Sequence, residues 1–162
     1  MRDAEPKSIY LKDYQPPHFV IEETHLRFDL FEDYAQVDSR LVMRRNREHH
    51  EGFEGPLVLV GNQLELLAIS VDGSRLSGDD YSLNGELLTI HTVSDAFELE
   101  ISTRNEPQNN TELEGLYKSG GMFCTQCEAE GFRRITFYLD RPDVMSIFTT
   151  EVIAEKSKYP IL

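Results

Sequence analysis

Apolar and polar residues alternate through much of the chain with the two-residue period of half-buried β-strands. Residues 24–30 form the first such run, and residues 35–43 have the spacing of its hairpin partner. Residues 97–103 form another. The side chains expected to point inward are Thr24, Leu26, Phe28, Leu30, Ala35, Val37, Ser39, Leu41, Met43, Phe97, Leu99, Ile101 and Thr103. No comparable stretch carries a helical stripe, so the pattern predicts an all-β fold.

Turn signals divide the rest of the chain into shorter elements. Residues 57–60 read as a short buried strand, and the dipeptides Asp72-Gly73 and Asn84-Gly85 suit the positive φ angles of tight hairpin turns. Residues 135–138 and 148–154 are also strand-like. Three other stretches lack a strand pattern. We expect the charged, His-containing residues 44–56 to be a loop. The polar, Gly-rich residues 106–121 predict a long functional or partner-covered loop, and in residues 139–143 Pro142 forces a break or a helix start.

Composition and charge limit the class of partner. A chain of 162 residues fits one domain, and its net charge of −13, from 16 basic and 29 acidic residues, repels phosphate backbones and anionic lipid. We therefore expect neither nucleic-acid nor membrane binding. No apolar run approaches the roughly 20 residues of a membrane span, and the first ten residues are polar, which favours a cytoplasmic protein. The two cysteines are consistent with a reducing compartment.

Candidate catalytic or metal-binding chemistry is sparse. Cys124 and Cys127 form a Cys-x-x-Cys pair, which is half of a structural zinc site, a redox pair, or two ordinary loop and core residues. The other half of a zinc site is missing, so the ordinary interpretation is favoured. His49 and His50 are adjacent and lack the spacing of a metalloprotease helix, so we expect a solvated loop. These residues alone specify no catalyst and no metal site.

The segment of residues 124–143, CTQCEAEGFRRITFYLDRPD, is the most unusual part of the sequence. Together with residues 113–117 and 138–144, it resembles the amino-terminal domain of the bacterial aminopeptidase N family, and weaker similarity covers nearly the whole chain. The resemblance implies an antiparallel β-sandwich or saddle-like domain packed against a thermolysin-like catalytic domain. In the family that domain carries one zinc ion, the general-base Glu and the exopeptidase motif, none of which occurs in these 162 residues.

The resemblance also assigns two substrate-binding residues. By position, Glu128 corresponds to the family's acidic residue that helps to hold the free α-amine of a peptide substrate, and Gln126 to the residue that lines the pocket for the first side chain. A protonated amine needs a carboxylate acceptor, so the chemistry is reasonable. We expect Glu130 to pair with Arg133 or Arg134 instead. Asp140 and Arg141 are interpreted as turn architecture.

Three hypotheses follow from this sequence. In the first, residues 1–162 are the amino-terminal domain of a longer zinc aminopeptidase, inactive alone, without a cofactor of its own, and partnered by its own catalytic domain across an exposed apolar surface. The abrupt end at residues 159–162 favours an excised portion. In the second, the domain serves only interdomain packing. In the third, the chain is a stand-alone thiol or metal protein that uses Cys124 and Cys127.

Overall fold

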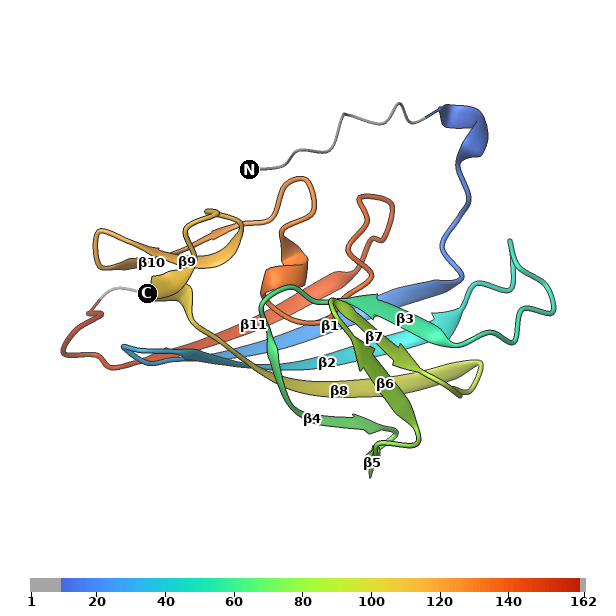
Figure 1. Cartoon of the computed structure of the whole chain (residues 1–162), viewed down its shortest axis with the longest axis horizontal. Helices are drawn as coiled ribbons and strands as arrows, with labels where there is room; N and C mark the ends of the chain where they lie inside the picture. The colour runs from blue at the N-terminus through green and yellow to red at the C-terminus, as the bar shows by residue number, and fades with distance from the viewer. Residues whose placement is uncertain (1–9, 161–162) are drawn as a thin grey trace.

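Three β-sheets and three short 3-10 helices make up residues 10–160, the part of the chain that the computed structural model describes (Figure 1). The elements in chain order are η1 (Leu11–Asp13), β1 (Phe19–Leu30), β2 (Ala35–Arg45), β3 (Leu57–Val60), β4 (Glu65–Val71), β5 (Ser74–Arg75), β6 (Tyr81–Asn84), β7 (Leu87–Ile90), β8 (Ala96–Asn105), η2 (Pro107–Asn109), β9 (Gly115–Ser119), β10 (Met122–Gln126), η3 (Phe132–Arg134) and β11 (Ile147–Ala154). The predicted all-β fold is confirmed. Within this described part, no helix has the length and apolarity that a membrane crossing requires.

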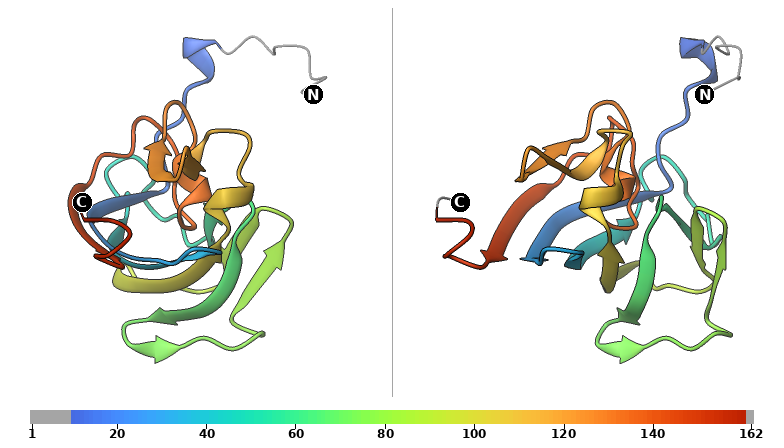
Figure 2. Two further views of the ribbon diagram at one scale, coloured as in Figure 1. Left: turned by 90° about the vertical axis from the view of Figure 1, so that its left-hand side faces the viewer. Right: turned by 60° about the vertical axis from the view of Figure 1, so that its left-hand side comes forward.

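A six-stranded sheet with the strand order β11-β1-β2-β8-β4-β5 forms the base of the molecule. Its strands pair antiparallel except at one edge, where β11 runs parallel to β1, with Glu23 opposite Ile147 and Leu30 opposite Ala154. The hairpin β9–β10 and the three-stranded sheet β3-β7-β6 complete the fold. In both views of Figure 2 the hairpin and η3 lie over one face of the curved sheet.

Alternation along the long strands places one face of the six-stranded sheet in the core. Every side chain expected to point inward from β1, β2 and β8 is buried. One part of this face packs in a cluster with β3 and β7, through residues such as Leu41, Leu57 and Ile90. The other part packs under the β9–β10 hairpin, through residues such as Phe28 and Leu116. Each buried aliphatic or aromatic side chain contributes about 1.5–3 kcal/mol. The first cluster therefore holds β3 and β7 against the sheet, and the second holds the hairpin over it.

The tight turns follow the glycine signals closely. At Asp72-Gly73 both residues have positive φ (50° and 73°) and the flanking Val71 and Ser74 pair, as predicted. The second turn begins one residue later than predicted, because Asn84 belongs to β6 and pairs with Leu87. Gly85 alone then supplies the positive φ of 60°, which suits a hairpin turn that needs glycine at its first central position.

Two predictions about the second half of the chain are wrong. Residues 135–138 are fully buried but form no strand, and only Tyr138 makes a β-bridge, with Val60. An apolar run signals burial, and here side chains of the large sheet replace the partner strand: Thr103 donates to the Ile135 carbonyl at 3.3 Å. Residues 106–121 are not one loop either. They contain η2 and all of β9, whose neighbouring glycines form the turn into β10.

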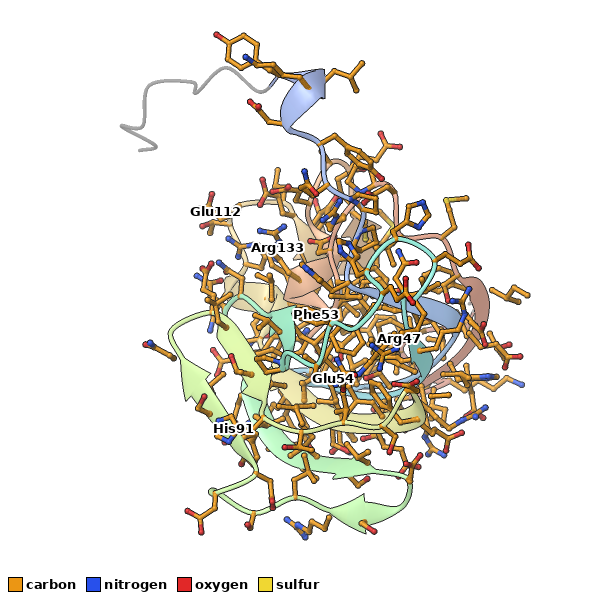
Figure 3. All side chains as sticks on the ribbon, turned by 90° about the vertical axis from the view of Figure 1, so that its right-hand side faces the viewer. Arg47, Phe53, Glu54, His91, Glu112 and Arg133 are labelled. Atoms are coloured by element: carbon orange, nitrogen blue, oxygen red, sulfur yellow. The ribbon has the colours of Figure 1, made fainter. Side chains whose placement is uncertain are left out.

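Of the loop expected at residues 44–56, residues 46–56 are irregular structure and include the adjacent histidines, whereas Arg44 and Arg45 still belong to β2. Arg47 holds it in place by donating to the Phe53 carbonyl (2.9 Å) and to Glu54 (2.8 Å) (Figure 3). His50 bonds through Nε2 to the Pro16 carbonyl at 2.8 Å, so this loop also fastens the segment that precedes β1.

Candidate functional site

The two residues assigned to substrate binding lie at the end of the β9–β10 hairpin. Gln126 is the last residue of β10, where it pairs with Gly115, and Glu128 follows in the turn that leads to η3. Both side chains are exposed, and the Gln126 amide donates to the Glu128 carbonyl at 3.4 Å. Among the described residues the Glu128 carboxylate has no hydrogen bond or ion pair, so its charge is not compensated within this part of the chain.

Two glycines fix the base of this turn. A Cβ on Gly131 would lie 2.6 Å from the Gln126 carbonyl oxygen, and a Cβ on Gly115 would lie 2.4 Å from the Cβ of Arg134. The Gly131 amide also donates to the Cys127 carbonyl at 2.8 Å. The two ends of the turn, Gln126 and Gly131, therefore pack closely on each other and on Gly115, with no room for a side chain at either glycine. We refer to residues 126–131, held in this way, as the acidic loop.

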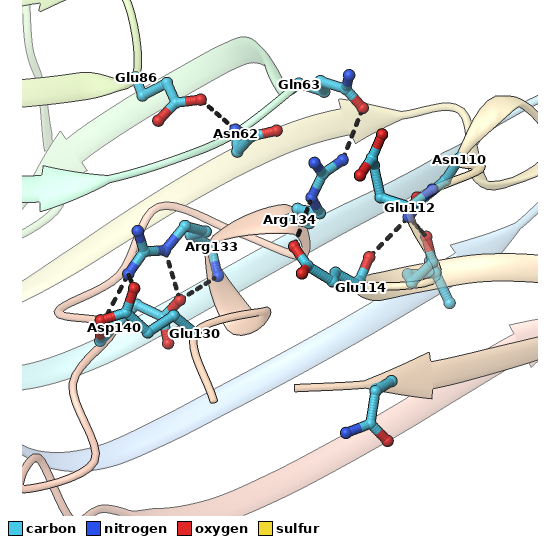
Figure 4. A network of polar contacts seen from close by, with 12 residues as sticks. Asn62, Gln63, Glu86, Asn110, Glu112, Glu114, Glu130, Arg133, Arg134 and Asp140 are labelled. Atoms are coloured by element: carbon cyan, nitrogen blue, oxygen red, sulfur yellow. Dashed lines mark hydrogen bonds and ion pairs between the residues drawn. The ribbon is translucent and has the colours of Figure 1, made fainter. Parts of the chain in front are cut away.

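Arg133 joins the acidic loop to a buried carboxylate (Figure 4). Its Nε donates to Asp140 Oδ2 at 2.7 Å and its backbone amide to the same oxygen at 3.1 Å, while Nη2 donates to the Asp140 carbonyl at 3.2 Å. Nη2 also lies 3.2 Å from Glu130 Oε2. The predicted pairing of Glu130 is thus confirmed with Arg133, and the Asp140 side chain, 7% exposed, is structural as expected.

A polar groove lies beside the acidic loop, lined by Asn62, Glu86, Glu112, Glu114, Ala129, Glu130, Arg133 and Arg134. Arg134 donates to Gln63 at 2.8 Å and pairs with Glu114 at 3.6 Å, and Glu86 accepts from the Asn62 amide. Figure 3 shows Glu112 and Arg133 toward one end of the molecule and His91 toward the other. Four carboxylates against two guanidinium groups give the groove an excess of negative charge.

Sequence reasoning missed most of this groove. Asn62 lies just after β3 and Glu86 lies in the turn between β6 and β7, both far from the acidic loop in the chain, and no local motif connects them with it. Glu112 and Glu114 lie in the polar residues 106–121, for which the sequence predicts one loop. The only feature of the sequence that indicates these two residues is the group of glutamates at positions 106, 112 and 114.

Neither cysteine has the surroundings of a reactive or metal-binding thiol. Burial raises the pKa of the Cys127 thiol, and the charge of Asp140 raises it further, so the thiolate is disfavoured at neutral pH. Both cysteines are unpaired and line an apolar groove with Phe123 and Phe132. Across residues 10–160 no three His, Cys, Asp or Glu side chains are grouped so that they could hold a metal ion.

The sequence profile of the Peptidase M1 N-terminal domain matches residues 61–161. The chain belongs to this family. Aminopeptidase N of Caulobacter vibrioides is 44% identical over 162 residues, which is all of this chain but 18% of that protein. The family resemblance inferred from residues 113–117 and 124–144 is therefore confirmed, and the chain spans less than a fifth of the length of this relative.

Solved structures of an aminopeptidase and of an M1 metallopeptidase have the same fold. Legionella pneumophila aminopeptidase A, solved in complex with aspartic acid, superimposes with a TM-score of 0.86 at 27% identity, over 93% of this chain and 18% of that one. An M1 zinc metallopeptidase of Deinococcus radiodurans gives a TM-score of 0.65 at 16% identity, over 83% of this chain and 32% of that one, which is a likeness of fold alone. This M1 domain thus has the expected antiparallel architecture, with β11 as its parallel edge.

Proposed function

We propose that the intact enzyme removes amino-terminal residues from peptides, and that this domain holds the free α-amine with Glu128 while Gln126 shapes the first subsite. The observation that carries the proposal is the acidic loop, in which Glu128 is exposed and uncompensated while Glu130 is engaged by Arg133. A charge-assisted hydrogen bond to an ammonium group contributes about 1.5–3 kcal/mol. Holding that amine at a fixed place selects the first peptide bond of the substrate.

The metal belongs elsewhere in the proposed enzyme. The described residues offer no ligand cluster for zinc, so we assign the one zinc ion to the catalytic domain of the full-length protein, where it supplies Lewis-acid chemistry. What this chain contributes is recognition. Gln126 and Glu128 present an amide and a carboxylate from the rigid end of a hairpin, which orients the substrate without taking part in bond cleavage.

An apolar surface supports the proposed partnership with a catalytic domain. Along β11 the side chains of Ile147, Phe148, Val152 and Ile153 are exposed, by 72% in the case of Ile147. Phe148 and Val152 continue into the apolar groove beneath the β9–β10 hairpin. Large exposed apolar patches of this kind mark protein interfaces. The same surface favours the second candidate function, a module that serves only interdomain packing.

The test is steady-state hydrolysis of an alanyl anilide by the full-length, zinc-loaded enzyme, with Glu128→Gln as the variant. Loss of the charge-assisted bond should lower kcat/KM by about tenfold to a hundredfold. The 162-residue domain alone should be inactive. An unchanged variant would leave packing as the role of this domain, and activity in the isolated domain would overturn the proposal entirely.

A further inference from the structure

The acidic loop contains two exposed carboxylates, and among the described residues only one of them lacks a partner. Glu128 has no partner among the described residues, whereas Glu130, with 61% of its side chain exposed, is paired with Arg133 at 3.2 Å. Both residues lie in the turn of residues 128–130, and the Glu130 carboxylate is held at Arg133. An ammonium group bound at Glu130 instead of Glu128 would therefore hold a peptide at a different place from the one proposed for the α-amine.

We propose that Arg133 is a positioning residue that keeps Glu130 out of substrate recognition, so that the loop presents a single free carboxylate to the α-amine. This inference rests on the proposed function of Glu128. Arg133 is suited to the task because its planar guanidinium can serve two acceptors in different directions at once. Its Nε binds buried Asp140 at 2.7 Å, and its Nη2 reaches back to Glu130.

The contacts of Arg133 make its position firm. The Asp140 side chain is only 7% exposed. A buried carboxylate that loses its partner strongly destabilises the fold, so the pair between Arg133 and Asp140 is strongly favoured. The neighbouring Arg134 cannot substitute, because its guanidinium is engaged by Gln63 and Glu114. The charge of Glu130 is thus compensated by one cation, Arg133, and the buried Asp140 carboxylate holds that cation in place.

Kinetics distinguish this role from simple support of the fold. If Glu130 is freed, a substrate amine can bind at either carboxylate, and binding at Glu130 is unproductive. Unproductive binding lowers kcat and KM by the same factor and leaves kcat/KM unchanged, because the productive route from free enzyme and substrate is untouched. Structural damage to the site would instead lower kcat/KM.

The variant to make in the full-length, zinc-loaded enzyme is Arg133→Lys. A lysine retains a cation for Asp140 but, as a single point charge, cannot span to Glu130 as well. We expect kcat and KM for an alanyl anilide to fall together by about twofold, as equal occupancy of two carboxylates requires, with kcat/KM nearly unchanged. Adding Glu130→Gln should restore both constants to their wild-type values, because the competing carboxylate is gone.

A matched control separates this effect from the general charge of the groove. Glu112 lines the same groove, so Arg133→Lys with Glu112→Gln removes one negative charge without touching the acidic loop. This double variant should behave like Arg133→Lys alone. Restoration by Glu112→Gln, absence of restoration by Glu130→Gln, or a loss of kcat/KM in Arg133→Lys would each overturn the inference. An inactive wild type or an unaffected Glu128→Gln variant would instead refute the proposed function.

Discussion

At the scale of single residues, Gly115 connects the fold to the acidic loop. Its φ of 68° lies in the left-handed region, and a Cβ there would also meet the Gly131 carbonyl oxygen at 2.8 Å. Gly120 has a similar φ of 56°, but a Cβ there would meet nothing within 4 Å. The two positions therefore separate the cost of the backbone conformation from the cost of close packing.

Gly115→Ala should lower the free energy of unfolding more than Gly120→Ala does. The strained φ costs each variant about 1 kcal/mol, and overpacking adds about 1–3 kcal/mol at Gly115 alone. Urea unfolding of both variants measures the difference directly. Equal losses would show that the turn relaxes without cost and that the acidic loop is not fixed by this contact.

At the scale of elements, the segment that leads into β1 is fastened by residues distant in the chain. The carbonyls of Gln15, Pro16 and Pro17 accept hydrogen bonds of 2.8 Å from Arg141, His50 and Asn46 respectively. The His18 ring stacks on His50 with 4.1 Å between the ring centroids, and it also contacts Phe53. This junction brings two imidazoles and a guanidinium close together.

The stability that this junction contributes should fall at acidic pH. Desolvation, followed by the charges of His50 and Arg141, lowers the pKa of His18 below the ordinary value of 6.5. The folded state then binds fewer protons than the unfolded state, so the contribution of His18 to stability is present above pH 6.5 and falls as the pH drops toward its lowered pKa. An NMR titration should give a His18 midpoint below 6.5, moving upward in His50→Gln. A midpoint above 6.5 would contradict this account.

At the scale of the whole molecule, the six-stranded sheet has one protected edge and one open edge. The β5 edge is only two residues long, whereas β11 is eight residues long, carries one charge, Glu151, and exposes apolar side chains on both faces. Short strands and charges are the usual protection against edge pairing, and β11 has little of either.

The isolated 162-residue domain should therefore self-associate through β11. Ile147→Lys together with Ile153→Lys places two charges on the exposed edge and should shift the domain toward the monomer in sedimentation velocity, with little change in unfolding temperature. Leu83→Lys is the matched control, because Leu83 is 46% exposed but belongs to β6. If the control has the same effect, association is not specific to this edge.

The sequence predicted regular structure well where one face of a strand is buried. Alternation identified the inward residues of β1, β2 and β8 because a half-buried strand forces that period on its sequence. It failed at residues 135–138, where burial on all sides produces an apolar run whether or not a strand exists. The acidic loop was located through a family resemblance. Its partner groups, such as Glu86 and Asn62, come together only through long-range folding, which no local pattern records.

The parallel pairing of β11 with β1 also bears on the order of events during synthesis. Residues 23–30 leave the ribosome well before residues 147–154, the strand that completes their side of the sheet. Until β11 emerges, the nascent sheet has to persist with the backbone of β1 unpaired along that side. Pairing between segments so distant in the chain is slow to form, and an unpaired strand edge is prone to aggregation. This edge is therefore where the nascent chain would benefit from a chaperone.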